Sequence, residues 1–211
     1  MPVPVLGPKV PKSDGRLTRP LSRVLLRLFG WRVLGVFPDV AQCVLIVAPH
    51  TSNWDFVFGL GAKWALGLRV RFIGKHSLFR FPLGVFMRRV GGIPVDRHSA
   101  EGFAERVAKE FESGAPLWLV VAPEGTRRRV TRWKTGFHRI AVAADVPILP
   151  IALDYQARAV RALPLYTPSG DYARDLRALA AHFAPAMACQ PAKYAPPELE
   201  EGATGGGAAP S

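Results

Sequence analysis

Short apolar segments bounded by proline, glycine and polar residues recur along the chain. Apolar runs of about four to eight residues between such breakers are typical of buried strands, and longer amphipathic segments are typical of helices. These patterns predict strands near 42–48, 69–74, 92–95, 117–122 and 148–154, with another at 157–162. They predict helices near 17–36, 54–66, 77–90, 99–113, 136–145 and 171–184. The alternation predicts a single α/β domain with a mostly parallel central sheet flanked by helices.

The domain organisation follows from length and composition. A chain of 211 residues can bury one substantial core. We expect an irregular basic lead over 1–16, a folded domain over 17–185 that begins with an amphipathic helix, and a disordered Ala-, Pro- and Gly-rich tail over 186–211. The two cysteines, Cys43 in a predicted strand and Cys189 in the tail, do not suggest a disulfide framework, which favours a reducing compartment.

We expect neither a signal peptide nor a membrane-spanning helix. Its first 20 residues are rich in proline and basic residues and lack the apolar stretch of a signal peptide. No apolar run approaches the roughly 18 residues of a spanning helix. We therefore expect a cytoplasmic protein.

A histidine and an aspartate lie at the end of the first predicted strand. His50 follows the apolar run 43–48 and Pro49, and Asp55 follows five positions later. Residues five apart do not share a face of a regular helix, so we expect His50 in the turn and Asp55 in the first helical turn, pointing back. Such an aspartate would leave the second imidazole nitrogen as a base. Alternatively, Asp55 forms a capping box with Ser52 and His50 is an incidental turn residue.

A second turn with polar residues follows the predicted strand at 117–122. It contains Glu124, Gly125, Thr126 and Arg127. An arginine on a turn can bind a phosphate through two hydrogen bonds, and glycine lets backbone N–H groups approach the ligand. The alternative is a solvated loop in which Glu124 and Arg127 form a structural ion pair.

Two further blocks complete an ordered set of motifs. Residues 91–97 read G-G-I-P-V-D-R, and residues 146–151 read V-P-I-L-P-I. In this order the four blocks resemble those of the glycerolipid acyltransferase family, which includes bacterial 1-acylglycerol-3-phosphate acyltransferases. The family motifs are H-x4-D, G-x-I-x-[IV]-D-R, E-G-T-R and V-P-[IV]-x-P. Four ordered motifs are far more specific than one, and the resemblance covers roughly residues 43–155.

The resemblance implies transfer of a fatty acyl group to the hydroxyl of a lysophospholipid. Acyl-CoA or acyl carrier protein would be the co-substrate, with no other cofactor and no metal. His50 would be the general base and Asp55 its orienting partner. The residues implied in substrate binding are Glu124, Gly125, Thr126, Arg127, Arg97 and Lys75. Lys75 belongs to a block that usually reads K-x-E-L, and here Ser77 replaces the glutamate.

The residue types fit this chemistry. Attack of an alcohol on a thioester needs a base and donors for the oxyanion, but it needs no protein nucleophile. The chain contains no G-x-S-x-G nucleophile motif.

The net charge of +12 predicts an anionic partner. Within 17–36, Arg19, Arg23 and Arg27 share one side of the predicted helix and apolar residues occupy the other, which suits the surface of an anionic membrane. A helix packed on the domain, with solvated arginines, is the alternative. Membrane contact would make the protein peripheral on the inner face of the cell membrane.

Nucleic acid would also explain the charge, but it would not explain the motifs, and no nucleic-acid-binding pattern accompanies the arginines. The expected partners are therefore a lysophospholipid, an acyl donor and an anionic membrane surface, without nucleic acid. Two alternatives stay open: another acceptor such as a lyso-ornithine lipid, and a non-catalytic lipid- or nucleic-acid-binding protein of the same fold.

Overall fold

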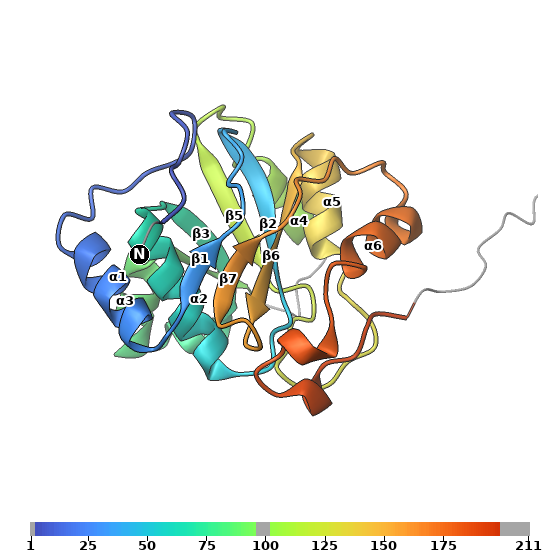
Figure 1. Cartoon of the computed structure of the whole chain (residues 1–211). Helices are drawn as coiled ribbons and strands as arrows, with labels where there is room; N and C mark the ends of the chain where they lie inside the picture. The colour runs from blue at the N-terminus through green and yellow to red at the C-terminus, as the bar shows by residue number, and fades with distance from the viewer. Residues whose placement is uncertain (1–2, 96–101, 199–211) are drawn as a thin grey trace, which may run out of the picture.

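The structure is a computed structural model that describes residues 3–95 and 102–198. Within these residues, seven strands form one sheet in the order β1-β7-β6-β2-β5-β3-β4 (Figure 1). The strands are β1 (Arg32–Leu34), β2 (Gln42–Ala48), β3 (Val70–Lys75), β4 (Gly92–Val95), β5 (Leu117–Val121), β6 (Ile148–Asp154) and β7 (Ala159–Ala162). Only β6 and β7 pair antiparallel among the described strands. The predicted α/β domain with a mostly parallel sheet is confirmed.

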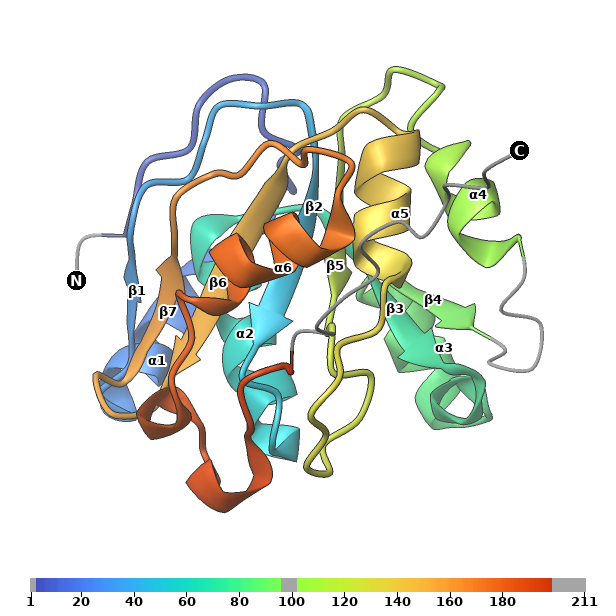
Figure 2. The same ribbon diagram turned by 90° about the vertical axis from the view of Figure 1, so that its right-hand side faces the viewer.

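Helices cover both faces of the sheet (Figures 1 and 2). On one face lie α1 (Thr18–Leu28) and α2 (Asn53–Leu66), and on the other lie α4 (Phe103–Ala108), α5 (Gly136–Ala143) and α6 (Tyr172–Ala180). The helix α3 (Leu83–Arg89) contacts β4, near the edge of the sheet. Short 3-10 turns are η1 (His76–Phe79), η2 (Pro185–Met187) and η3 (Pro191–Lys193). No helix in the described part of the chain is long and apolar enough to cross a membrane.

The central strand β2 is apolar on both sides because it joins two cores. Side chains alternate along a strand, so Cys43 and Leu45 pack in the core beneath α2, whereas Val44 and Ile46 pack in the core beneath α5. A strand buried on both faces reads as a continuous apolar run, which explains why its position could be predicted.

The helix predicted over 99–113 ends at Ala108, and a local breaker shortens or splits two other predicted helices. The helix predicted over 17–36 ends at Leu28, because Gly30 turns the chain with φ of 71° and the following residues form β1. The helix predicted over 77–90 is split into η1 and α3, because Arg80 is extended two residues before Pro82. In both places a local breaker ends a helix that the apolar pattern alone would continue.

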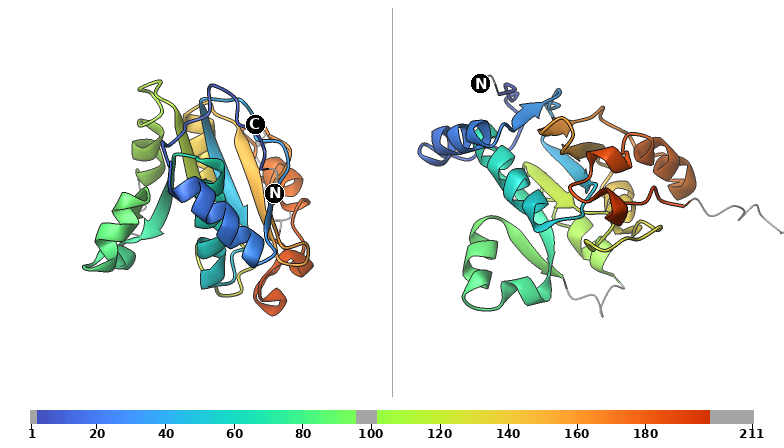
Figure 3. Two further views of the ribbon diagram at one scale, coloured as in Figure 1. Left: turned by 60° about the vertical axis from the view of Figure 1, so that its left-hand side comes forward. Right: turned by 60° about the horizontal axis from the view of Figure 1, so that its bottom comes forward.

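The helix α1 packs on α2 (Figure 3). Ser22 and Leu26 are buried in this contact. Arg23 Nε donates to the carbonyl oxygen of Ala65 at 3.0 Å, near the C-terminus of α2, where helix carbonyls favour a cation. Arg19 donates to the carbonyl oxygen of Ser13 at 2.6 Å. The opposite side of α1 is apolar and 54–84% exposed, at Leu17, Leu21, Val24 and Leu28.

The C-terminal segment is ordered further than the composition predicted. Disorder was expected from residue 186, but η2 and η3 form, and Tyr194 and Ala195 are buried. The Gln190 N–H donates to Thr51 Oγ1 at 3.2 Å, and the Glu198 N–H donates to the carbonyl oxygen of Thr131 at 2.7 Å. Residues 199–211 lie outside the described residues. Composition did not reveal these contacts because they are formed with distant parts of the chain.

A buried polar network joins α5 to α6. Asp175 on α6 is fully buried and lies 2.7 Å from Nε2 of His138 on α5. Its carboxylate also accepts hydrogen bonds from the Tyr166 hydroxyl at 2.7 Å and from the backbone and hydroxyl of Ser169. Burial raises the pKa of Asp175, but hydrogen bonds from Ser169, Tyr166 and His138 outweigh this and hold it below its usual value. The charged carboxylate of Asp175 therefore links α6 to α5 through His138.

Candidate active site

The predicted catalytic and phosphate-binding residues lie at the carboxyl ends of neighbouring parallel strands. His50 follows the end of β2, and the turn with Glu124 and Arg127 follows β5, which pairs directly with β2. Lys75 is the exposed last residue of β3, the next strand in the sheet. Arg97 lies outside the described residues. In open α/β sheets this edge is where ligands bind, so the fold brings the motifs to a suitable place.

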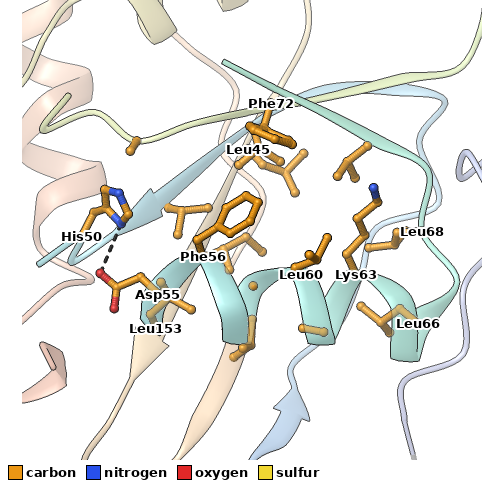
Figure 4. Close-up of a pocket in the computed structure, with 18 of the residues that line it drawn as sticks. Leu45, His50, Asp55, Phe56, Leu60, Lys63, Leu66, Leu68, Phe72 and Leu153 are labelled. Atoms are coloured by element: carbon orange, nitrogen blue, oxygen red, sulfur yellow. Dashed lines mark ion pairs between the residues drawn. The ribbon is translucent and has the colours of Figure 1, made fainter. Parts of the chain in front are cut away.

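His50 and Asp55 face each other across the start of α2 (Figure 4). His50 Nδ1 lies 3.2 Å from Asp55 Oδ2, with side chains 21% and 1% exposed, respectively. If Nδ1 carries the proton, it donates to the carboxylate, and Nε2 is the nitrogen with a lone pair for a substrate. The imidazole is therefore partly accessible to a substrate, whereas the carboxylate of Asp55 is shielded from solvent.

Asp55 also closes the N-terminus of α2. Its Oδ2 atom accepts from the N–H groups of Thr51 and Ser52, both at 2.7 Å, and Ser52 Oγ accepts from the Trp54 N–H at 3.2 Å. This is a capping box, which satisfies backbone donors that have no partner inside the helix. The dyad and the capping box, which were alternatives from the sequence, are formed by the same carboxylate.

Glu124 is turned inward, toward the main chain of His50. It is 3% exposed, and its Oε1 atom accepts from the His50 N–H at 2.7 Å. Burial raises the pKa of Glu124 to about 7; the hydrogen bond from His50 opposes this change, and the charge of Asp55 adds to it. Glu124 therefore ties the turn after β5 to the turn after β2.

The rest of the turn after β5 has a defined shape and an exposed basic side. Gly125 has φ of 65°, and the Lys134 side chain occupies the space that a Cβ atom would need. Thr126 Oγ1 accepts from the Arg128 N–H at 3.2 Å. Arg127 is exposed, as are the two arginines that follow it. The turn thus presents positive charge to solvent beside the buried Glu124.

An apolar cavity of about 180 Å³ runs beneath α2, from His50 toward Leu66 and Leu68 (Figure 4). Its wall from α2 includes Phe56 and Leu60, and its wall from the sheet includes Leu45, Phe72, Val120 and Leu153. A Cβ atom at Gly59 would meet no atom within 4 Å, so this glycine leaves space in the wall. At the far end, Lys63 Nζ donates to the carbonyl oxygen of Val90 at 2.5 Å. The cavity can hold an apolar chain whose end reaches the imidazole.

Three residues that the sequence did not indicate, Tyr155, Gln190 and Tyr194, interact with Asp55, Thr51 and Glu124, respectively. The Tyr155 hydroxyl donates to Asp55 Oδ1 at 2.8 Å. Gln190 binds Thr51 through its backbone, and the Tyr194 hydroxyl is buried without a hydrogen-bond partner among the described residues. Burial raises the pKa of Tyr194, and the charge of Glu124 adds to the effect. Tyr155 is 100 positions from Asp55, so no local pattern could have indicated the contact.

Two other chemistries, metal ligation and catalysis by the buried cysteine Cys43 as a nucleophile, find little support in the described residues. No group of three or more His, Cys, Asp or Glu side chains is placed to hold a metal ion in residues 3–95 and 102–198. Cys43 is buried, and burial raises the pKa of its thiol well above the usual range. It is therefore a poor nucleophile.

The sequence model of the family described as Acyltransferase matches residues 35–154, more than half of the chain. The chain belongs to this acyltransferase family. It is 29% identical over 154 residues to the 1-acyl-sn-glycerol-3-phosphate acyltransferase of Haemophilus influenzae, covering 68% of this chain and 62% of that protein. It is also 29% identical over 160 residues to the Escherichia coli enzyme of the same name, covering 71% and 63%. The alignments thus span little more than three fifths of these bacterial relatives.

The fold is shared with a solved structure. The crystal structure of the 1-acyl-sn-glycerophosphate (LPA) acyltransferase PlsC from Thermotoga maritima matches with a TM-score of 0.53 and 17% sequence identity. The match covers 75% of this chain and 70% of that chain. At this identity the match establishes the common fold.

Replacing Glu124 by glutamine should change how stability depends on pH. The folded pKa of about 7 exceeds the ordinary 4.5, so the native state holds an extra proton between these values and the parent loses stability as pH rises from about 5 to about 8. Glutamine keeps an acceptor for the His50 N–H but does not titrate. We therefore expect the free energy of unfolding of Glu124→Gln, relative to that of the parent, to rise by on the order of 2 kcal/mol between pH 5 and pH 8, since one pKa unit corresponds to about 1.36 kcal/mol.

Urea unfolding followed by tryptophan fluorescence at pH 5, 6, 7 and 8 measures this difference. Glu112→Gln, at an exposed position, is the matched control and should follow the parent. If Glu124→Gln follows the parent as well, the charge of Glu124 is not what weakens the fold at high pH.

Proposed function

We propose that the protein is an O-acyltransferase that moves a fatty acyl group from acyl-CoA or acyl carrier protein to a hydroxyl of a lysophospholipid such as 1-acylglycerol-3-phosphate. One observation carries the proposal: the His50–Asp55 pair lies at one end of an apolar cavity and beside an arginine-bearing turn. Membership of the acyltransferase family supports the reaction type. The names of the bacterial relatives support the acceptor.

His50 is the general base of the proposed reaction. Its Nε2 atom takes the proton of the acceptor hydroxyl while the hydroxyl oxygen attacks the thioester carbonyl carbon. The C–O bond forms, the C–S bond then breaks, and the departing thiolate receives the proton from the imidazolium. Asp55 holds the ring through Nδ1 and stabilises its charge while the proton is bound. The acyl group passes directly to the alcohol, without an acyl-enzyme intermediate.

The turn after β5 is the proposed binding site for the acceptor's phosphate. Arg127 supplies the charge, and Gly125 and Thr126 set the shape of the turn; Arg97 and Lys75 are proposed as further phosphate ligands. The inward orientation of Glu124 supports an indirect part for this residue, since its carboxylate holds the His50 backbone. Glu124 thereby fixes the proposed phosphate-binding turn relative to His50.

The cavity beneath α2 is the proposed site for a fatty acyl chain. Its lining is almost entirely apolar, and each buried methylene group contributes about 0.8 kcal/mol to binding. A chain in this cavity would bring its carboxyl end to His50, where the reaction takes place.

The exposed apolar side of α1 is the proposed contact with a membrane, on the inner face of the cell membrane. Two observations support it. Phe29, just after α1, is 56% exposed, and its ring contacts the buried ring of Phe58 edge to face; Trp54, which is 53% exposed, stacks on the same ring. Trp54 lies in the first turn of α2, so a bilayer on these exposed side chains would lie near the start of the helix that carries Asp55. Aromatic and aliphatic side chains of this kind enter the interface of a bilayer.

Loss of the base should abolish acyl transfer without unfolding the protein. We expect His50→Ala to lose at least about 100-fold in kcat, the lower end of what a general base contributes. Asp55→Asn should lose both activity and stability, because the carboxylate also caps α2. The assay uses lysophosphatidic acid with acyl-CoA and with acyl carrier protein, followed by lipid mass spectrometry. Full turnover per folded molecule in His50→Ala would remove the proposed mechanism.

Arg127 should matter more for a phosphorylated acceptor than for a neutral one. A charge-assisted hydrogen bond is about twice as strong as a neutral one, and lysine cannot reproduce the paired hydrogen bonds of a guanidinium. We expect Arg127→Lys to raise KM for lysophosphatidic acid more than KM for an uncharged monoacylglycerol. Arg129→Lys, an exposed neighbour, is the control. Equal changes on both acceptors would mean that Arg127 does not bind the phosphate.

Polar substitutions on α1 should weaken membrane binding. An apolar side chain contributes about 1.5–3 kcal/mol when fully buried, so the variant with serine at positions 21, 24 and 28 should bind liposomes at least tenfold more weakly. Its control has serine at the exposed apolar positions 36, 142 and 165, away from α1. Both are compared by co-sedimentation with liposomes of anionic phospholipid. If the two variants pellet equally, α1 is only a packing element.

A further inference from the structure

Tyr155 contacts the catalytic pair from outside the four sequence motifs that carry the resemblance. It directly follows β6, and its hydroxyl donates to Asp55 Oδ1 at 2.8 Å. The other oxygen of Asp55 faces His50 and the two N–H groups of the helix cap. Each carboxylate oxygen therefore has its own partners, and Tyr155 is what holds Oδ1.

We propose that Tyr155 is a positioning residue for acyl transfer, which fixes the rotation of the Asp55 carboxylate and through it the imidazole of His50. The inference rests on the proposed function, in which His50 is the base. A carboxylate can rotate about its Cβ–Cγ bond. The two backbone N–H groups hold Oδ2, and the Tyr155 hydroxyl holds Oδ1, so that the two oxygens together fix the plane that His50 Nδ1 meets.

The ring of Tyr155 is itself held by aromatic neighbours. It meets Trp31 edge to face, with centroids 4.8 Å apart, and Phe58 in the same way at 5.9 Å. Trp31 and Phe58 are stacked at 3.8 Å. The Tyr155 N–H donates to the carbonyl oxygen of Met187 at 2.9 Å. The edge-to-face contacts with this stacked pair and the backbone hydrogen bond leave the ring little freedom, so its hydroxyl is a well-placed donor.

The hydroxyl stays protonated under assay conditions. Burial raises the pKa of Tyr155 far above the usual range, and the hydrogen bond to Asp55, its charge and the nearby Cys189 add to this. A hydroxyl that keeps its proton donates at every pH at which the enzyme is assayed.

The fold contains a matched arrangement that serves as the control. The Tyr166 hydroxyl donates to Asp175 at 2.7 Å, and Asp175 pairs with His138, so tyrosine, aspartate and histidine occur in the same order as in the active site. This network joins α5 and α6, and Tyr166 pairs with the beginning of β6 while Tyr155 follows its end. Loss of either hydroxyl removes one hydrogen bond to a buried carboxylate, but only one of these carboxylates orients the base.

The experiment compares Tyr155→Phe with Tyr166→Phe, each of which removes one oxygen and keeps the ring. Initial rates of acyl transfer at varied acceptor give kcat and KM, and urea unfolding gives the folded fraction and the stability. We expect Tyr155→Phe to lose about tenfold in kcat, equivalent to about 1.4 kcal/mol, with KM for the acceptor unchanged. Tyr166→Phe should keep the kcat of the parent although it loses stability.

Proton NMR tests the positioning role directly, because a Tyr155 hydroxyl that only stabilised the fold would not affect the signal of the His50 Nδ1 proton. The low-field signal of the His50 Nδ1 proton, assigned by its loss in His50→Ala, should shift or broaden in Tyr155→Phe and stay in place in Tyr166→Phe. This measurement requires only folded protein.

The outcomes separate the inference from the proposed function. An unchanged kcat per folded molecule in Tyr155→Phe, or an equal loss in Tyr166→Phe, overturns the positioning role. An unshifted His50 signal in Tyr155→Phe overturns it as well. A parent protein that transfers no acyl group to any lysophospholipid acceptor overturns the proposed function instead.

Discussion

The buried carboxylate of Asp55 is the constraint on which the site depends. It accepts hydrogen bonds from the main chain of Thr51 and Ser52, from Tyr155, and faces the imidazole of His50. A carboxylate removed from water is destabilised by several kcal/mol unless such donors surround it. The same donors fix the position at which α2 begins. The position of His50, the proposed base, is therefore tied to the start of a helix, and a change that moves one moves the other.

Another buried acid, Glu124, connects the turn after β2 to the turn after β5. Burial raises the pKa of Glu124 to about 7, and the negative charge of Asp55 adds to this rise. Its hydrogen bond to the His50 N–H holds the turn after β2 against the turn after β5. Gly125, with positive φ, lets the chain change direction directly after Glu124. The buried Glu124 and the exposed Arg127 thus lie in the same turn. Glu124 holds the His50 backbone, and Arg127 is the proposed phosphate ligand.

The sequence predicted the strands well because each central strand is a continuous apolar run that a breaker ends. The segment predicted at 42–48 matches β2, and that predicted at 148–154 matches β6. It also placed His50 and Asp55 in one turn, since the spacing of five excludes a shared helical face. It could not indicate Tyr155, because that contact depends on how β6 lies beside β2 in the sheet. The order of the C-terminal segment was missed for the same reason, since Gln190 reaches Thr51 across 139 positions.

The direction in which α1 faces was also beyond the sequence, although its two sides were correctly distinguished. Arg23 and Arg27 are exposed, but Ser22 and Leu26 beside them are buried against α2, and Arg23 also reaches the carbonyl of Ala65, where the C-terminus of α2 attracts a cation. With this side packed against α2, the apolar side is turned outward. Phe29 continues this exposed side, and through Phe58 it is linked to Trp54 at the other end of α2. The helix α2 thus packs against the helix proposed to meet the lipid, and it carries Trp54, one wall of the apolar cavity and the aspartate that faces the proposed base. The proposed membrane surface, the cavity and the dyad are therefore connected through this one helix.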